Sequence, residues 1–97
     1  MKADMTSRYE RIQEILAAAF KPVALEIEDE SARHAGHKER NNLAGGETHY
    51  RVLMVSPALK GLSRLARSRA VHAALEAEFK TGLHALSLSL RAPDELV

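Results

Sequence analysis

Cysteine is absent from this sequence of 97 residues. Without a thiol, the chain can form no disulfide, and it offers neither a thiolate nucleophile nor a thiolate ligand for a metal. Any metal site built from this chain must therefore use histidine or carboxylate side chains.

The sequence also has few aromatic residues, a small net charge and no long apolar run. Phe, Tyr and Trp make up 4% of the chain, so surfaces on which nucleobases could stack are few. The net charge of +1, with 28% charged residues, indicates a mixed surface rather than that of a dedicated nucleic-acid binder. No apolar run approaches the roughly 20 residues that span a bilayer, and the polar start Met1–Arg11 lacks the apolar core of a signal peptide. We therefore expect no membrane partner and a cytoplasmic location.

Sequence motifs of common enzyme classes are missing as well. There is no Gly-x-Ser-x-Gly elbow, Walker loop, His-Glu-x-x-His helix or dinucleotide fingerprint. Ser31 and His34 could in principle act as nucleophile and base, but a long loop offers little of the preorganisation that such chemistry needs. We expect a binding module rather than an enzyme. No composition break divides the chain, so we expect one domain over residues 1–97.

Hydrophobic periodicity predicts two helices and three strands. A capping box at Ser7 and Glu10 begins a helix that ends before Pro22, and Ser63 caps a second helix that ends before Gly82. The strands are predicted at 23–28, 49–55 and 84–90, and a last helical turn at 93–95. The order is α-β-β-α-β, which predicts an α/β (α+β) fold with a three-stranded mixed sheet and both helices on one face.

The connections between these elements predict the topology. The first two strands should pair antiparallel, whereas the second and third, joined by a helix, should run parallel in a right-handed crossover. The end of the first strand and the starts of the other two then share one edge of the sheet. We expect the long connection Asp29–Thr48, together with His49 and His84, to gather at that edge. Strands one and three lie about 10 Å apart across strand two, so His34 could reach His84.

Two segments resemble the signature of BolA-like proteins. They are Glu30–His37 (ESARHAGH) and Glu47–Val52 (ETHYRV). The similarity continues through single positions and ends in Leu83–Leu86 (LHAL); these positions are Ser56, Gly61, Ser63, Arg67, Arg69, Val71, Ala73, Ala74 and Leu75. The sequence departs from the family pattern at Leu59, Ser68 and Leu96, and Lys38–Gly46 is somewhat long. The resemblance covers nearly the whole chain and implies a fold like the type II KH domain.

The resemblance also implies a function and a partner. BolA-like proteins pair with monothiol glutaredoxins of the Cys-Gly-Phe-Ser (CGFS) type and share a [2Fe-2S] cluster, in iron-sulfur trafficking or iron sensing. On this basis His34 and His84 are the expected metal ligands. Since the chain has no thiolate, the glutaredoxin cysteine and a glutathione would supply sulfur while this chain supplies imidazole nitrogen, as in Rieske centres. The isolated protein should hold no cluster.

Each histidine also has an ordinary structural interpretation, because an isolated histidine is most often a surface or packing residue. His37 is a second candidate for the loop ligand, although a solvated position suits it better. His84 could be a half-buried residue that caps the core. His49 is expected to form a hydrogen bond that fixes local geometry, with a role as substitute ligand left open. His72, within the second helix, should be indifferent to metal.

Nucleic-acid binding is the alternative function, because KH domains bind single strands and some BolA-like proteins are described as transcriptional regulators. Lys60, Arg64 and Arg67 are spaced to lie on one side of the second helix. However, KH domains grip the backbone with a Gly-x-x-Gly loop, and only Gly61 occupies that region here. Any such binding should be weak and strongly dependent on salt.

Overall fold

The computed structural model describes residues 7–30 and 48–95. In chain order, the elements are helix α1 (Arg8–Phe20), strands β1 (Ala24–Asp29) and β2 (His49–Val55), the 3-10 turn η2 (Pro57–Leu59), helices α4 (Arg64–Ala74) and α5 (Glu76–Lys80), strand β3 (Ala85–Arg91) and the 3-10 turn η3 (Pro93–Glu95). Their order agrees with the predicted α-β-β-α-β pattern.

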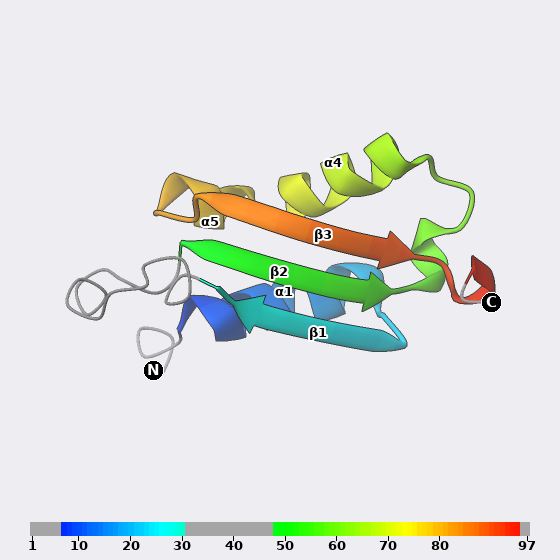
Figure 1. Cartoon of the computed structure of the whole chain (residues 1–97), viewed down its shortest axis with the longest axis horizontal. Helices are drawn as coiled ribbons and strands as arrows, with labels where there is room; N and C mark the ends of the chain where they lie inside the picture. The colour runs from blue at the N-terminus through cyan, green and yellow to red at the C-terminus, as the bar shows by residue number, and fades with distance from the viewer. Residues whose placement is uncertain (1–6, 31–47, 96–97) are drawn as a thin grey trace.

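The three strands form one mixed sheet in the order β1-β2-β3. β1 pairs antiparallel with β2, whereas β3 runs parallel to β2, as Figure 1 shows by the directions of the arrows. Both pairings and the central position of β2 were predicted and are confirmed. β3 begins at Ala85 rather than at the predicted His84, because the N–H groups of both residues donate to the Thr48 carbonyl and the regular ladder starts only afterwards.

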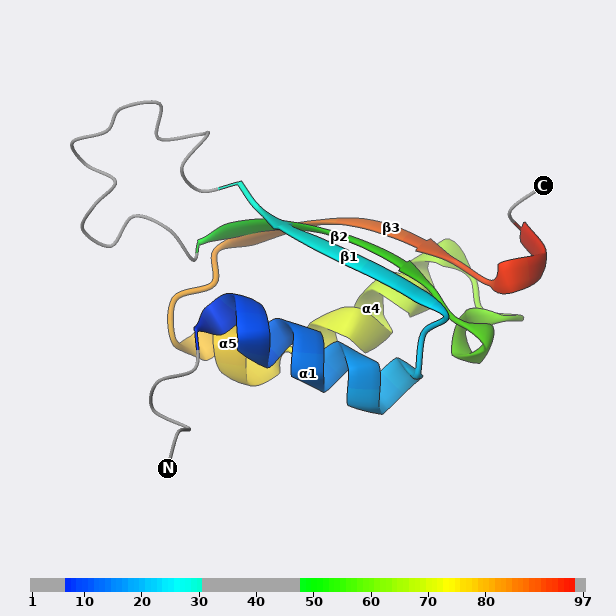
Figure 2. The same ribbon diagram turned by 90° about the horizontal axis from the view of Figure 1, so that it is seen from below.

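Within residues 7–30 and 48–95, helices α1, α4 and α5 lie on one face of the sheet, and no α-helix lies on the opposite face (Figure 2). The core forms between them. Alternate residues of β2 and one stripe of α1 are fully or almost fully buried, and they meet Val71 and Leu75 from the helical layer; the contributing side chains are Tyr50, Val52, Met54, Ile12 and Leu16. This is the burial expected of a strand with period two and a helix with period 3.6.

The helical ends follow the sequence signals, but the second predicted helix is broken. Ser7 forms the predicted capping box with Glu10, and the Ser63 hydroxyl accepts a hydrogen bond from the N–H of Ala66. Leu75 leaves the helical conformation, with φ −101° and ψ 17°, and separates α4 from α5. No glycine or proline marks this break. The Leu75 side chain is fully buried, so packing against the core overrides local helix propensity here.

Within the residues that the structure describes, no helix is long and apolar enough to cross a membrane.

Candidate functional site

The candidate site lies at the edge of the sheet where β1 ends and where β2 and β3 begin. Here the N–H of Glu30 donates to the His49 carbonyl over 2.8 Å, and the N–H groups of His84 and Ala85 donate to the Thr48 carbonyl over 2.8 and 3.1 Å. Glu30 and Thr48 flank residues 31–47, so both anchor points of that segment lie at this edge: Thr48 is bonded to His84, and Glu30 is bonded to His49 on the other side of β2. This agrees with the edge predicted from the topology.

Two imidazoles meet at this edge. The His84 side chain is exposed and that of His49 is half-buried, and their ring centroids lie 5.3 Å apart with the ring planes tilted by 50°. The Thr48 hydroxyl lies 3.0 Å from Nδ1 of His49, which is the local hydrogen bond expected for this residue. The exposure of His84 does not fit the interpretation that it caps the core.

The pair offers nitrogen ligands but not a complete metal site. In the described ranges 7–30 and 48–95, no group of three or more His, Cys, Asp or Glu side chains could hold a metal ion. His34 and His37 lie outside the described residues. The described donor set at this edge therefore consists of two imidazoles, those of His49 and His84.

The proximity of His49 to His84 is a feature that the sequence analysis did not predict. His49 pairs with Ala85 in the parallel register, so His84 comes one residue before the position opposite His49. A residue-level register between the second and third strands would have revealed it. His72 lies elsewhere on α4, where it stacks on Phe79 at 5.2 Å and its Nδ1 lies 2.9 Å from the Ser68 carbonyl.

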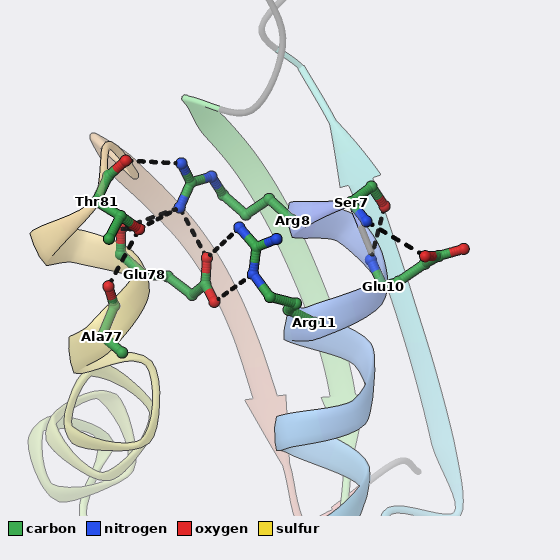
Figure 3. A network of polar contacts seen from close by, with 7 residues as sticks. All are labelled: Ser7, Arg8, Glu10, Arg11, Ala77, Glu78 and Thr81. Carbon is green, nitrogen blue, oxygen red and sulfur yellow. Dashed lines mark hydrogen bonds and ion pairs between the residues drawn. The ribbon is translucent and has the colours of Figure 1, made fainter. Parts of the chain in front are cut away.

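A buried ionic network holds the turn that precedes His84 (Figure 3). Nη1 of Arg8 donates to the Glu78 carboxylate over 2.7 Å, and Nη2 donates to the Thr81 carbonyl over 3.0 Å. The Glu78 carbonyl accepts a hydrogen bond of 2.9 Å from the N–H of Leu83, the residue before His84. The start of α1 thereby fixes the connection between α5 and β3.

Glycine is required at position 82 of this turn. Gly82 has φ +130°, and a Cβ added there would lie 2.9 Å from Nη2 of Arg8. The backbone conformation and the neighbouring guanidinium both exclude a side chain. Arg8 and Glu78 are buried charges that the sequence analysis did not identify as structural residues.

Ion pairs and hydrogen bonds shift the pKa values of two groups, Glu78 in this network and Arg51 at the sheet edge. Hydrogen bonding from Arg11, at 2.8 Å, and the charges of Arg11 and Arg8 hold the pKa of Glu78 below its ordinary value despite its burial. Near the end of β1, Arg51 binds the Glu28 carboxylate at 2.7 Å and Glu30 at 3.3 Å, which raises the pKa of its guanidinium. The two shifts favour the ionised form of Glu78 and the protonated form of Arg51.

The three cations predicted for nucleic-acid binding differ in their surroundings. Lys60 precedes α4 rather than lying on it, and it pairs with Asp94 at 3.3 Å. Arg67 forms a two-pronged ion pair with Glu95, with both N···O distances 2.7 Å. Arg64 makes no ion pair within the described part of the chain. Two of the three predicted cations are therefore paired with carboxylates of the C-terminal turn η3, and Arg64 is not.

Comparison with known proteins gives one family. Residues 16–95 match the family model described as BolA-like protein. The chain is 45% identical over 92 residues to "SufE-like protein 1, chloroplastic/mitochondrial" of Arabidopsis thaliana, covering 93% of this chain and 25% of that protein. It is 46% identical over 79 residues to the "DNA-binding transcriptional regulator BolA" of Escherichia coli (strain K12), covering 81% of this chain and 70% of that protein.

Solved structures of the same family share the fold. BolA1 from Arabidopsis thaliana superposes with a TM-score of 0.86 at 39% identity, over 95% of this chain and 98% of that one. The BolA domain of SufE1 from the same plant gives 0.81 at 43% identity, over 94% and 98%. The chain thus corresponds to a quarter of the full SufE-like relative but to nearly all of its BolA domain.

Proposed function

Because this chain belongs to the BolA-like protein family, we propose that it is a binding module that pairs with a monothiol (CGFS-type) glutaredoxin and shares a [2Fe-2S] cluster with it, in iron-sulfur cluster trafficking or iron sensing. In this proposal the chain is not an enzyme, and residues 1–97 act as one domain. The cytoplasm remains our predicted location, although two plant relatives carry organellar names.

The observation that carries the proposal is the exposed imidazole of His84 beside His49 in a chain without cysteine. A two-iron cluster is held by thiolates, with histidine replacing cysteine on one iron in Rieske centres. This chain can provide only the nitrogen part of such a ligand set. Its chemistry therefore fits a shared cluster, for which the partner cysteine and a glutathione supply the thiolates.

The roles of the individual residues follow from their positions. His84 presents an imidazole to solvent at the end of a turn that Arg8 and Glu78 hold in place. We assign His84 and His34 as the metal ligands, with His34 supplied by the segment that begins after Glu30. The Thr48 contact at Nδ1 orients His49 next to His84. His49 then either supports the His84 ring or replaces His34 as ligand, as His37 could.

The test is cluster sharing in solution. The protein is mixed with a cluster-loaded CGFS glutaredoxin and glutathione, and complex formation is followed by gel filtration and visible circular dichroism. We expect a one-to-one complex and a changed spectrum, because nitrogen replaces a thiolate on one iron. Pulsed electron paramagnetic resonance of the reduced cluster should then detect a strongly coupled imidazole nitrogen.

Histidine variants identify the ligands. His84→Ala and His34→Ala should each remove one nitrogen coupling and weaken the complex while far-UV circular dichroism stays unchanged. His49→Ala and His37→Ala distinguish a supporting residue from a substitute ligand. His72→Ala is the matched control, since His72 is also exposed but lies on α4, and it should leave the spectra unchanged. No complex with the wild-type chain, or unchanged spectra for all variants, would refute the proposal.

A second candidate function is regulation through nucleic-acid binding, which is supported by the similarity to the DNA-binding transcriptional regulator of Escherichia coli. Two of the three predicted cations are paired with carboxylates, which reduces the positive charge available to phosphates. We therefore expect weak binding without sequence preference that falls steeply with salt. Tight, sequence-selective binding at about 150 mM salt would favour this function over the first.

A further inference from the structure

Strand β3 forms an edge of the sheet that no further strand covers within residues 7–30 and 48–95. The Arg91 carbonyl points toward β2, at whose end it accepts from the N–H of Ser56 over 2.9 Å. The Leu90 carbonyl points the other way, where it accepts from Nη1 of Arg67 over 3.2 Å. Because peptide groups alternate in direction along a strand, the N–H and C=O groups of Leu86 and Leu88 also point away from β2.

A groove runs along this edge between β3 and α4, which lie side by side in Figure 1. Leu62 and Leu88 contribute apolar surface to it, and Arg64 and Arg91 contribute positive charge. Leu62, which lines the groove, is 38% exposed, and Leu65, one residue beyond Arg64, is 58% exposed. The groove thus combines main-chain hydrogen-bonding groups with apolar and cationic side chains.

One end of the groove already binds a carboxylate. Arg67 holds both oxygens of Glu95 at 2.7 Å while it donates to the Leu90 carbonyl. Among the described residues that line the groove, Glu95 is the only acidic one, and it is occupied by this contact. Arg64 makes no ion pair in the described part of the chain, so the charge that remains favours an acidic ligand.

We propose that an extended, acidic segment of a partner protein binds in this groove and pairs with β3 as a fourth strand. Its main chain would bond to the outward N–H and C=O groups of Leu86 and Leu88, and its carboxylates would meet Arg64 and Arg91. The proposal does not depend on cluster sharing, since the groove lies along the strand beyond His84.

The chemistry of the edge favours a peptide over its competitors. Outward carbonyl groups need hydrogen-bond donors, which a phosphate backbone lacks at neutral pH and a peptide main chain provides. Apart from His72, the described groove residues include no aromatic ring on which bases could stack. A second copy of this chain that paired through the same edge would bring its own Arg64 and Arg91 to the groove, and like charges would oppose each other there.

The test uses the full chain and an acetylated, amidated hexapeptide of alternating valine and glutamate. In ¹⁵N NMR titrations we expect shifts concentrated on Leu86 and Leu88, and slower hydrogen exchange of their amides in the complex. Arg64→Glu should weaken binding about tenfold, because it reverses a charge at the groove. Arg69→Glu is the matched control, since Arg69 is exposed on α4 but does not line the groove, and it should bind normally.

Two modified peptides test for strand pairing. One carries N-methyl groups on its valine amides and the other on its glutamate amides, so each blocks one edge of the peptide while keeping its charge. We expect one of the two to lose binding. Equal binding of both, unshifted amides at Leu86 and Leu88, or equal binding of a valine-lysine peptide would overturn the proposal.

Two further outcomes would overturn the proposal by identifying a different occupant of the groove. If an oligothymidylate shifts the same amides more tightly than the peptide at about 150 mM salt, the groove binds nucleic acid. If sedimentation shows self-association and the Leu86 and Leu88 amides are protected before peptide is added, a second copy occupies the edge. Neither result bears on the glutaredoxin complex, so the two proposals fail independently.

Discussion

Replacing Glu78 with glutamine should destabilise this protein more than any single surface substitution. The Glu78 side chain is 6% exposed and accepts hydrogen bonds from both Arg8 and Arg11, whose side chains are 7% and 37% exposed. A neutral amide of the same shape keeps one acceptor oxygen but places an NH₂ group against a guanidinium. Arg11 can then turn to water, whereas Arg8 stays buried without its counter-charge.

The magnitude follows from the burial of Arg8. Breaking a buried ion pair by removing one partner costs about 3 to 5 kcal/mol, because the remaining charge is left uncompensated in a poorly solvated place. The Glu78 carbonyl and the hydroxyl and carbonyl oxygens of Thr81 still accept hydrogen bonds from Arg8, so we expect the lower end, about 3 kcal/mol. A domain of this length is stable by about 5 to 15 kcal/mol, so the loss is a large share of the total.

The assay is urea unfolding at pH 7 followed by far-UV circular dichroism. With a slope of about 1.5 kcal/mol per M, the midpoint should fall by about 2 M. Glu76→Gln is the matched control, because Glu76 lies on the same short helix in an ion pair with Lys80 whose side chains are 67% and 72% exposed. That variant should lose less than about 0.5 kcal/mol. Equal midpoints for the two variants would refute the argument from burial.

The pH dependence provides an independent check of the same network. The pKa of Glu78 is lower in the folded protein than in the unfolded chain, so its ionised form stabilises the fold. This contribution is fully present above the unfolded pKa, near 4.5, and is lost as the pH falls through the lowered folded value. The stability difference between wild type and Glu78→Gln should therefore shrink below about pH 4.5. A difference that grows with acid would contradict the assigned shift.

Three further predictions concern local structure. Gly82→Ala should destabilise the fold by more than about 1 kcal/mol in urea unfolding, because the positive φ and the Arg8 guanidinium both oppose a Cβ. An unchanged stability would mean that the turn can rearrange to accept the methyl group. Ser63→Ala should cost about 1 kcal/mol through loss of the N-terminal cap of α4, with Ser63→Asp as the variant that retains stability. The Glu95 carboxyl should titrate at about 2 by NMR, and Arg67→Gln should return it toward 4.5; an unmoved midpoint would disprove the pairing.

Much of the fold could be predicted because its signals are local. The capping box at Ser7, the period-two burial of β2 and the cap at Ser63 each depend on residues within a few positions of one another. The pairing directions then followed from connection lengths. The break at Leu75 could not be predicted in this way, because it depends on the contact of that side chain with a distant core.

The candidate site was predictable only at the level of the sheet edge. The directions of the three strands place the start of β3 at the same sheet edge as the anchor points of residues 31–47, and this inference requires no side-chain detail. The 5.3 Å contact between His49 and His84 depends on register, and a shift by one residue would turn His49 to the other face. Sequence patterns specify that alternation but not which residues stand opposite one another.

The buried charges show why the supporting residues of this site are difficult to predict. Arg8 and Glu78 are 70 residues apart in sequence, and each alone resembles an ordinary polar position near the end of a helix. They become structural only when α1 and α5 lie on the same face of the sheet and meet the turn at Gly82. Because that turn leads directly into His84, the network that stabilises the fold also determines where the exposed imidazole stands. Substitutions within the network should therefore be compared by His84 geometry as well as by stability, since both depend on the same guanidinium.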